Sequence, residues 1–195
     1  MKKILMTMVA AFAALSMNAQ DYYVGGALGF QTQSYDGDNL GNTIMFMPEV
    51  GMKVDDQWSI GVVVGYGNTK RSKNATGTVD LNTSVFKIAP YARYTAFKFG
   101  AVNVFADGVF SLVSGNQESY NAITNSADDN KYTKWGIAIQ PGIAYNISDN
   151  FSLVAKFGNL IGYENSKPDG GKATTTLDIL SLSGNNLSFG FYYNF

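Results

Sequence analysis

The sequence predicts an all-β fold, an eight-stranded antiparallel up-and-down β-barrel that crosses a membrane. Eight segments alternate apolar and polar residues with period two, which is the pattern of strands with one apolar face. The connections between these segments alternate between short and long. Charged residues are only 15% of the chain and aromatic residues are 14%, a composition that favours a membrane-spanning sheet with aromatic bands over a soluble domain.

The N-terminal segment has the pattern of a secretory signal peptide. Two lysines precede an uncharged apolar run at residues 4–15, and Ala19 offers a small residue for cleavage. The run is shorter than the about 20 residues that a membrane-spanning helix needs. We therefore expect residues 1–19 to be removed and residues 20–195 to form one barrel domain.

Each of the eight segments is predicted to be a strand because it has an apolar face of its own. The last is the clearest, because apolar or aromatic residues alternate with small or polar ones up to the final Phe195. Most segments cover roughly the 9–11 residues that a tilted spanning strand needs. In chain order, the apolar faces lie within residues 22–30, 44–54, 58–66, 86–96, 102–112, 135–147, 151–157 and 187–195.

The lengths of the connections predict that the two ends of the barrel differ, with short turns at one end and long loops at the other. Short connections lie at residues 55–57, 98–100 and 148–150. Long polar connections lie at residues 33–42, 68–82, 114–132 and 164–185. Short turns at one end and long loops at the other are typical of transmembrane barrels, and lipid requires the sheet to close because an open edge leaves backbone groups unpaired.

Aromatic residues near both ends of the segments predict two girdles at the membrane boundaries. Amphipathic rings favour the level of the lipid headgroups. The alternative, a soluble core, requires a charged opposite face, whereas that face is rich in Gly, Ala and Ser. The residues that we assign to the girdles are Tyr22, Trp58, Tyr66, Trp135, Tyr145 and Phe151.

The opposite face of the strands predicts a charged cluster in the barrel interior. In a barrel of this size side chains fill the lumen, and buried charges must pair. We expect a salt-bridged plug with some enclosed water, and the alternative interpretation is a gated path for ions or protons. The cluster consists of Glu49, Lys53, Lys87, Arg93, Asp107 and Lys156. Glycines that share this face, read as packing residues, are Gly25, Gly29, Gly61, Gly65 and Gly142.

The composition argues against several classes of function. The chain has neither His nor Cys, so the usual general bases and thiol nucleophiles are missing and we expect no enzyme activity. Its formal net charge of −1 lacks the basic footprint of a nucleic-acid binder. Residues 36–41 are faintly similar to a calcium loop, but Met47 stands where the twelfth-position glutamate is required. We expect no catalytic residue, metal or cofactor.

These features together resemble the OmpX/OmpA-like outer-membrane β-barrel family, including the small barrel proteins of Bacteroidetes. The resemblance rests on the alternating strands, the Ser-Asp-Asn turn at residues 148–150, the Ala19-Gln20 cleavage context and the aromatic C-terminus. It implies location in a bacterial outer membrane, surrounded by lipids and lipopolysaccharide. It also implies a C-terminal signal read by the barrel-assembly machinery, formed by Phe189, Phe191, Tyr193 and Phe195. No peptidoglycan-binding domain follows, so a cell-wall tether is not expected.

Two hypotheses about function remain from the sequence. The first is a structural or surface-interaction role, in which a rigid barrel presents its long loops outward, alone or as an accessory subunit of a larger outer-membrane complex. The second is a narrow channel or transporter for ions or small solutes, which the inward-facing charges motivate. The two hypotheses differ in whether the lumen conducts.

Overall fold

The computed structural model describes residues 22–35, 38–71, 79–121, 126–180 and 187–195. The predicted signal peptide, residues 1–19, lies outside these ranges and stays a prediction. Within the described ranges no helix is long and apolar enough to cross a membrane.

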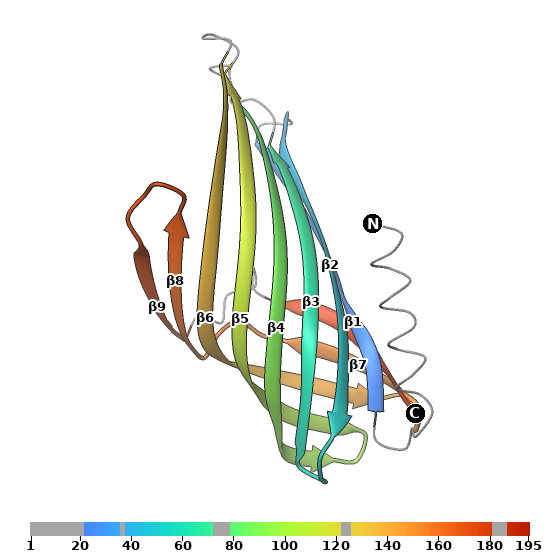
Figure 1. Cartoon of the computed structure of the whole chain (residues 1–195). Helices are drawn as coiled ribbons and strands as arrows, with labels where there is room; N and C mark the ends of the chain where they lie inside the picture. The colour runs from blue at the N-terminus through green and yellow to red at the C-terminus, as the bar shows by residue number, and fades with distance from the viewer. Residues whose placement is uncertain (1–21, 36–37, 72–78, 122–125, 181–186) are drawn as a thin grey trace.

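The described residues form a single antiparallel sheet of ten strands (Figure 1). The strands are β1 (Tyr22–Tyr35), β2 (Asp38–Lys53), β3 (Trp58–Arg71), β4 (Val79–Phe99), β5 (Val102–Asn121), β6 (Ser126–Asn146), β7 (Phe151–Lys156), β8 (Ile161–Pro168), β9 (Thr174–Ile179) and β10 (Ser188–Asn194).

Eight of these strands close into a ring, which confirms the predicted eight-stranded barrel. The ring runs from β1 through β7 in chain order, continues to β10 and returns to β1. The closing seam pairs Val24 with Tyr193, and the backbone N–H of Phe195 donates to the carbonyl oxygen of Tyr22 at 3.0 Å. The closed ring leaves no free edge around the lower half of the barrel, as lipid requires.

The strands β8 and β9 correct the sequence prediction, which treated residues 164–185 as a loop. β7 pairs with the lower part of β6, from Gly142 to Asn146. β8 pairs with the upper part of β6, from Tyr132 to Ile139. The interruption lies opposite Pro141, which has no N–H to donate. The threonines of residues 174–176 were read as polar loop, but Thr is β-branched and favours strands.

The other long connections are also shorter than predicted, because the strands extend into them as polar hairpins. β4, β5 and β6 have 21, 20 and 21 residues, about twice the length that spanning requires. Cross-strand polar contacts hold the extensions: the side-chain amide of Asn68 donates to Asn82 at 2.9 Å and to Ser84 at 3.0 Å. The polar residues of these segments therefore pair with one another across neighbouring strands.

The short connections are confirmed as tight turns at the opposite end. In the turn between β2 and β3, the carboxylate of Asp55 accepts hydrogen bonds from the backbone N–H groups of Gln57 and Trp58, both at 2.7 Å. The turn between β4 and β5 contains Gly100 with φ of 56°, a conformation that glycine adopts without strain.

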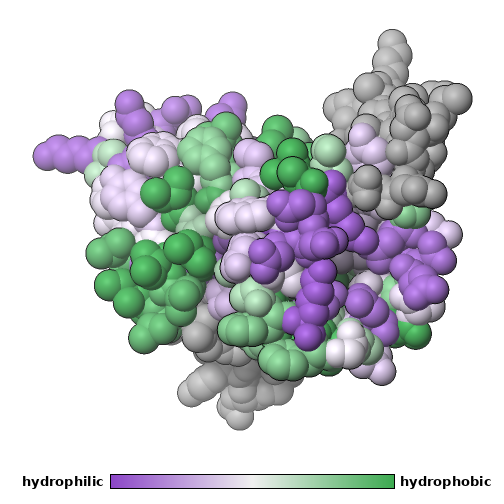
Figure 2. All heavy atoms as spheres, turned by 90° about the horizontal axis from the view of Figure 1, so that it is seen from below, coloured by the Kyte–Doolittle hydropathy of each residue, from purple (hydrophilic) through white to green (hydrophobic). Residues whose placement is uncertain are grey.

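The outward face of the ring is apolar over a band between the turns and the hairpins. Outward residues of β3 run from Trp58 to Tyr66 and become polar at Asn68. Seen from the turn end, hydrophilic residues gather toward the middle of the molecule and hydrophobic groups occupy parts of its edge (Figure 2). This band matches the apolar belt of a transmembrane barrel.

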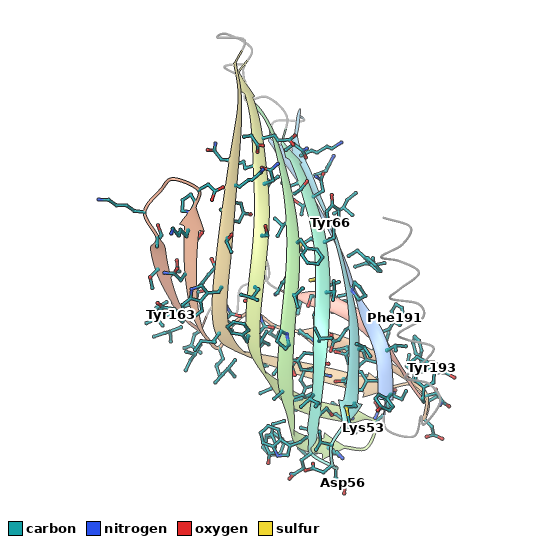
Figure 3. All side chains as sticks on the ribbon, in the orientation of Figure 1. Lys53, Asp56, Tyr66, Tyr163, Phe191 and Tyr193 are labelled. Carbon is teal, nitrogen blue, oxygen red and sulfur yellow. The ribbon has the colours of Figure 1, made fainter. Side chains whose placement is uncertain are left out.

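Most aromatic residues that the sequence assigns to girdles and to the C-terminal signal lie exposed on this outward face. Trp58, Tyr66, Trp135 and Tyr145 are between 41% and 55% exposed. The remaining two girdle residues, Tyr22 and Phe151, are half-buried. The exposed aromatic residues of the C-terminal strand and terminus are Phe189, Phe191, Tyr193 and Phe195; Phe191 and Tyr193 are labelled in Figure 3.

Candidate functional site in the barrel lumen

The lumen is crossed by a network of charged and phenolic side chains, which we call the plug. Its charged members are Glu49 on β2, Arg93 on β4, Asp107 on β5 and Lys156 on β7. All four occupy the inward phase of their strands, because successive side chains of a strand point to opposite faces. The phenolic members are Tyr23, Tyr91 and Tyr192.

Glu49 is the acceptor on which most of the plug converges. Its Oε1 accepts hydrogen bonds from the hydroxyls of Tyr91 at 2.5 Å and Tyr192 at 2.8 Å. Its Oε2 accepts one from the ammonium of Lys156 at 2.8 Å. Glu49 is 4% exposed. An ionised carboxylate is an acceptor only, so donors from several strands satisfy it and tie those strands together.

Arg93 supplies the central cation of the plug. Its Nε and Nη2 donate to the two carboxylate oxygens of Asp107 at 2.7 and 2.9 Å, which is the bidentate geometry that a guanidinium favours. Nη2 also lies 3.3 Å from Glu49 Oε1. The guanidinium carbon lies 3.9 Å from the ring centroid of Phe105. Arg93 therefore bridges both acids while its flat face packs on an aromatic ring.

The plug is balanced in formal charge. Lys156 contacts both acids, at 2.8 Å to Glu49 and 3.3 Å to Asp107, so two cations face two carboxylates. Asp107 is fully buried, at 0% exposed. Tyr23 joins the plug through a 2.6 Å hydrogen bond between its hydroxyl and that of Tyr91. This arrangement satisfies the condition under which charges tolerate burial.

The structure brings together four of the six charged residues that the sequence places inside the barrel. Lys53 lies at the turn end and is exposed (Figure 3). Lys87 is half-buried above the plug and has no ion pair or hydrogen bond with any described residue. The prediction missed the tyrosines of the plug, although each occupies the inward phase of its strand, because aromatic residues were assigned to the membrane boundaries. Within the described ranges no cluster of acids could hold a metal ion.

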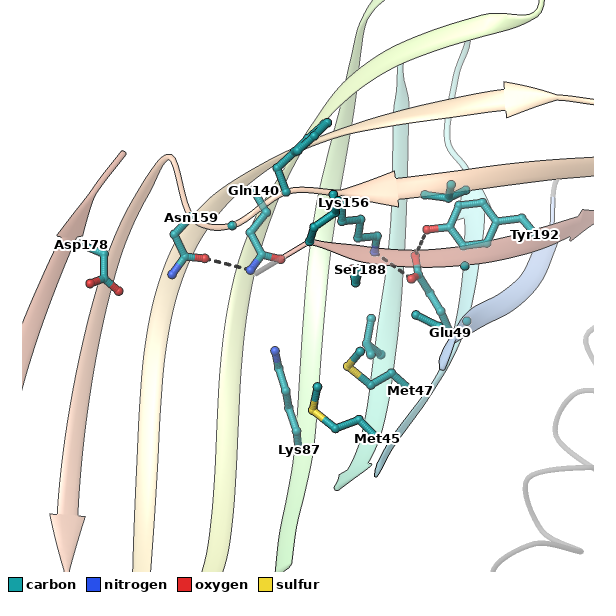
Figure 4. A pocket seen from close by; sticks show the side chains of 18 residues that line it. Met45, Met47, Glu49, Lys87, Gln140, Lys156, Asn159, Asp178, Ser188 and Tyr192 are labelled. Atoms are coloured by element: carbon teal, nitrogen blue, oxygen red, sulfur yellow. Dashed lines mark hydrogen bonds and ion pairs between the residues drawn. The ribbon is translucent and has the colours of Figure 1, made fainter. Parts of the chain in front are cut away.

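The plug separates two cavities in the lumen. The upper cavity has a volume of about 460 Å³, and Glu49, Lys156 and Tyr192 lie along its wall (Figure 4). The lower cavity has a volume of about 540 Å³ and is lined by Tyr23, Arg93 and other residues at the turn end. The inward side chains therefore divide the lumen rather than line one continuous pore.

Comparison with known families identifies the architecture. Residues 4–195 match the family described as "Outer membrane protein beta-barrel domain". The chain belongs to this family. The closed ring and the apolar outer belt thus place the barrel in the bacterial outer membrane, where the short turns of such barrels face the periplasm and the longer connections face outward. No curated protein sequence matches the chain significantly.

Several solved barrels align with the chain at low sequence identity. A major outer membrane protein from Thermus thermophilus aligns with a TM-score of 0.55 at 13% identity, covering 90% of this chain and 98% of that one. Neisserial surface protein A (NspA) aligns at 0.48 and 18%, covering 89% and 97%. The attachment invasion locus protein Ail of Yersinia pestis aligns at 0.45 and 16%, covering 90% and 97%. The first of these likenesses supports the shared fold of this outer-membrane barrel and nothing about its partners.

Proposed function

We propose that this outer-membrane barrel is a non-enzymatic surface-interaction protein whose outward hairpins contact a partner, alone or as an accessory subunit of a larger outer-membrane complex. The observation that carries the proposal is the plug, in which Glu49, Arg93, Asp107 and Lys156 fill the lumen as a balanced network. A lumen closed in this way favours a scaffold over a conduit.

The hairpins supply the surface for such an interaction. β5 and β6 remain paired from Leu112 and Trp135 at the membrane boundary up to Asn121 and Ser126. Paired strands hold these segments away from the membrane, and a rigid scaffold of this kind positions the residues of its loops for recognition. The exposed residues near the top include Glu118 and Asp129, which face each other in the register.

Shortening the hairpin between β5 and β6 tests the proposal. We expect replacement of residues 117–130 with an Asn-Gly turn to leave a folded barrel, because the shortened strands stay paired below it. Both proteins are purified from native outer membranes in mild detergent, and co-purifying components are identified by mass spectrometry. A component lost only from the shortened protein supports the proposal. The same components with both proteins would contradict it and assign the interface to the barrel wall.

The channel hypothesis makes a separate prediction in planar bilayers. We expect the wild-type protein to show no steady conductance, because the plug lies between the two cavities. Substituting both Tyr91→Ala and Tyr192→Ala removes two large rings from the plug while keeping its four charges, and we expect this variant to conduct. A steady wild-type current that changes with Arg93→Lys would overturn the scaffold interpretation in favour of a channel.

We further propose that the chain is made as a precursor of the Bacteroidetes type. The barrel-assembly machinery inserts the barrel into the membrane, where lipopolysaccharide surrounds it. The Ala19-Gln20 junction and the exposed aromatic residues near the C-terminus support this proposal. The expected result is a mature chain that begins at Gln20, measured by intact mass of protein from native membranes. A mass that retains residues 1–19 would contradict the cleavage.

A further inference from the structure

The upper cavity combines an apolar wall with a cation that has no ion-pair partner among the described residues. Its volume of about 460 Å³ is within the range of small-molecule sites. The cation is Lys87, which points into the cavity from β4, beside Met45 and Met47 (Figure 4). The apolar side chains along the wall are Met45, Met47, Val63, Val154, Phe157 and Leu187.

Lys87 differs from the other cation of this cavity. Lys156 is held by Glu49 at 2.8 Å and by Asp107 at 3.3 Å, whereas Lys87 has no ion pair with a described residue. Asp178 on β9 also lines the cavity but lies on the far side of Asn159 from Lys87 (Figure 4). Glu164 on β8 attracts Lys87 electrostatically, but its ion pair is with Lys134 at 2.9 Å. A half-buried ammonium without an ion pair of its own is costly, so this position favours an anionic group from outside the chain.

The cavity lies where the barrel wall divides. β1 pairs with β10 only over residues 23–27, while β9 pairs with β8 and with no other described strand. Apolar side chains flank this division: Leu28 on β1 is 71% exposed and Ile179 on β9 is 67% exposed. Ile179 lies level with Ile139, within the apolar belt. Leu28 and Ile179 therefore present apolar side chains to lipid on the two strands that flank this division.

We propose that the upper cavity binds a single-chain anionic amphiphile from the membrane, of the fatty-acid class, with its carboxylate at Lys87 and its chain along the methionine-lined wall toward the division between β1 and β9. Methionine suits this wall because its flexible thioether adapts to chains of different shape. This site is independent of the hairpins, and its occupant does not need to cross the plug.

The experiment measures binding of laurate to the mature barrel in phosphatidylcholine nanodiscs, with empty nanodiscs subtracted. We expect saturable binding that weakens about ten- to hundredfold with Lys87→Met, which removes a charge-assisted contact and keeps an unbranched side chain of similar length. Dodecanol should bind more weakly than laurate because it lacks the charge, and acetate should not bind because it lacks the chain. Asp178→Asn should leave laurate binding unchanged or tighten it.

Two further variants test whether binding depends on this cavity. Lys53→Met removes a lysine outside this cavity, in the lower part of the lumen, and should bind laurate as the wild type does. Met47→Trp fills the upper cavity and should prevent binding. Each variant is first shown to fold by its compact migration on SDS gels before boiling. Laurate binding no greater than in empty nanodiscs, or equal in the wild type and Lys87→Met, would overturn the proposal.

Discussion

Gly25→Ala is expected to destabilise the closed barrel at its seam. Gly25 lies in the seam, paired with Tyr192 on β10 and with Glu49 on β2. A Cβ atom at this position would overlap the backbone carbonyl oxygen of Phe191 and lie 2.5 Å from the Tyr192 ring. Because a backbone atom of the partner strand cannot move without breaking the ladder, we expect a loss of about 3 kcal/mol in unfolding free energy, the upper end of typical overpacking costs.

The effect extends beyond the seam because the two cross-strand partners of Gly25, Tyr192 and Glu49, belong to the plug. The absence of a side chain at Gly25 leaves room for the Tyr192 ring, whose hydroxyl donates to Glu49. The next residue, Gly26, has a φ of 148°, which side-chain-bearing residues rarely adopt. Gly25 thus lets β1 approach β10 closely, while Gly26 lets it approach β2, where a Cβ atom would overlap the backbone of Met47 and Pro48. Displacing Tyr192 would remove one donor from Glu49.

The matched control is Gly108→Ala, on the outward face of β5. A Cβ atom there would meet only the carbonyl oxygen of Ala92, at an ordinary 3.7 Å, and a side chain in a strand interior reduces the entropy cost that glycine carries. We expect this variant to fold as well as the wild type. The measurement is the fraction of refolded protein that migrates as a compact band without boiling. Equal fractions for the two variants would show that the seam tolerates a side chain.

The sequence predicted the barrel well because its strongest signal is also its strongest physical constraint. A strand with one face in lipid and one in the lumen must alternate, so residues 58–66 and 187–195 reveal their orientation without any tertiary information. The short turns were equally readable, since Asp55 has the side chain that caps such a turn. These features depend on residues close together in the chain.

The hairpins and the tyrosines of the plug were not predicted, for two different reasons. Polar segments such as residues 114–121 resemble loops in composition, and only pairing with β4 and β6 makes them strands. Tyr91 and Tyr192 favour a membrane boundary and a polar lumen equally, since each ring has an apolar body and a polar tip. Their inward phase was visible in the sequence, but their common partner Glu49 lies 42 and 143 residues away.

The charges inside the barrel could be identified from the sequence, but their pairing could not. Alternation places Arg93, Asp107, Lys53 and Lys87 on the same face, and it does not specify their height along the barrel axis. The register provides that height: Arg93 pairs directly across from Asp107, whereas Lys87 pairs with Val113 farther up. Register is a long-range property, and here it separates the residues of the plug from those of the cavities.

Arg93→Met is expected to destabilise the barrel by about 3–5 kcal/mol, the cost of breaking a buried ion pair by removing one partner. The substitution leaves Glu49 and Asp107 with Lys156 as their only ion-pair partner among the described residues. It also removes both hydrogen bonds to Asp107, which is 0% exposed. Arg93→Lys should lose less, because it keeps the charge while losing the bidentate geometry and the packing on Phe105.

A second substitution separates lost charge balance from lost packing. Adding Asp107→Asn to Arg93→Met restores equal numbers of buried cations and carboxylates, so part of the stability should return if charge is the cause. Lys134→Met is the control. Lys134 forms an ion pair with Glu164 at 2.9 Å, but the two side chains are 32% and 42% exposed. Exposed ion pairs contribute under about 1 kcal/mol to stability. All variants are compared by urea unfolding in lipid vesicles. If Arg93→Met and Lys134→Met cost the same, the plug does not stabilise the barrel and its balanced charges would have to be explained by conduction instead.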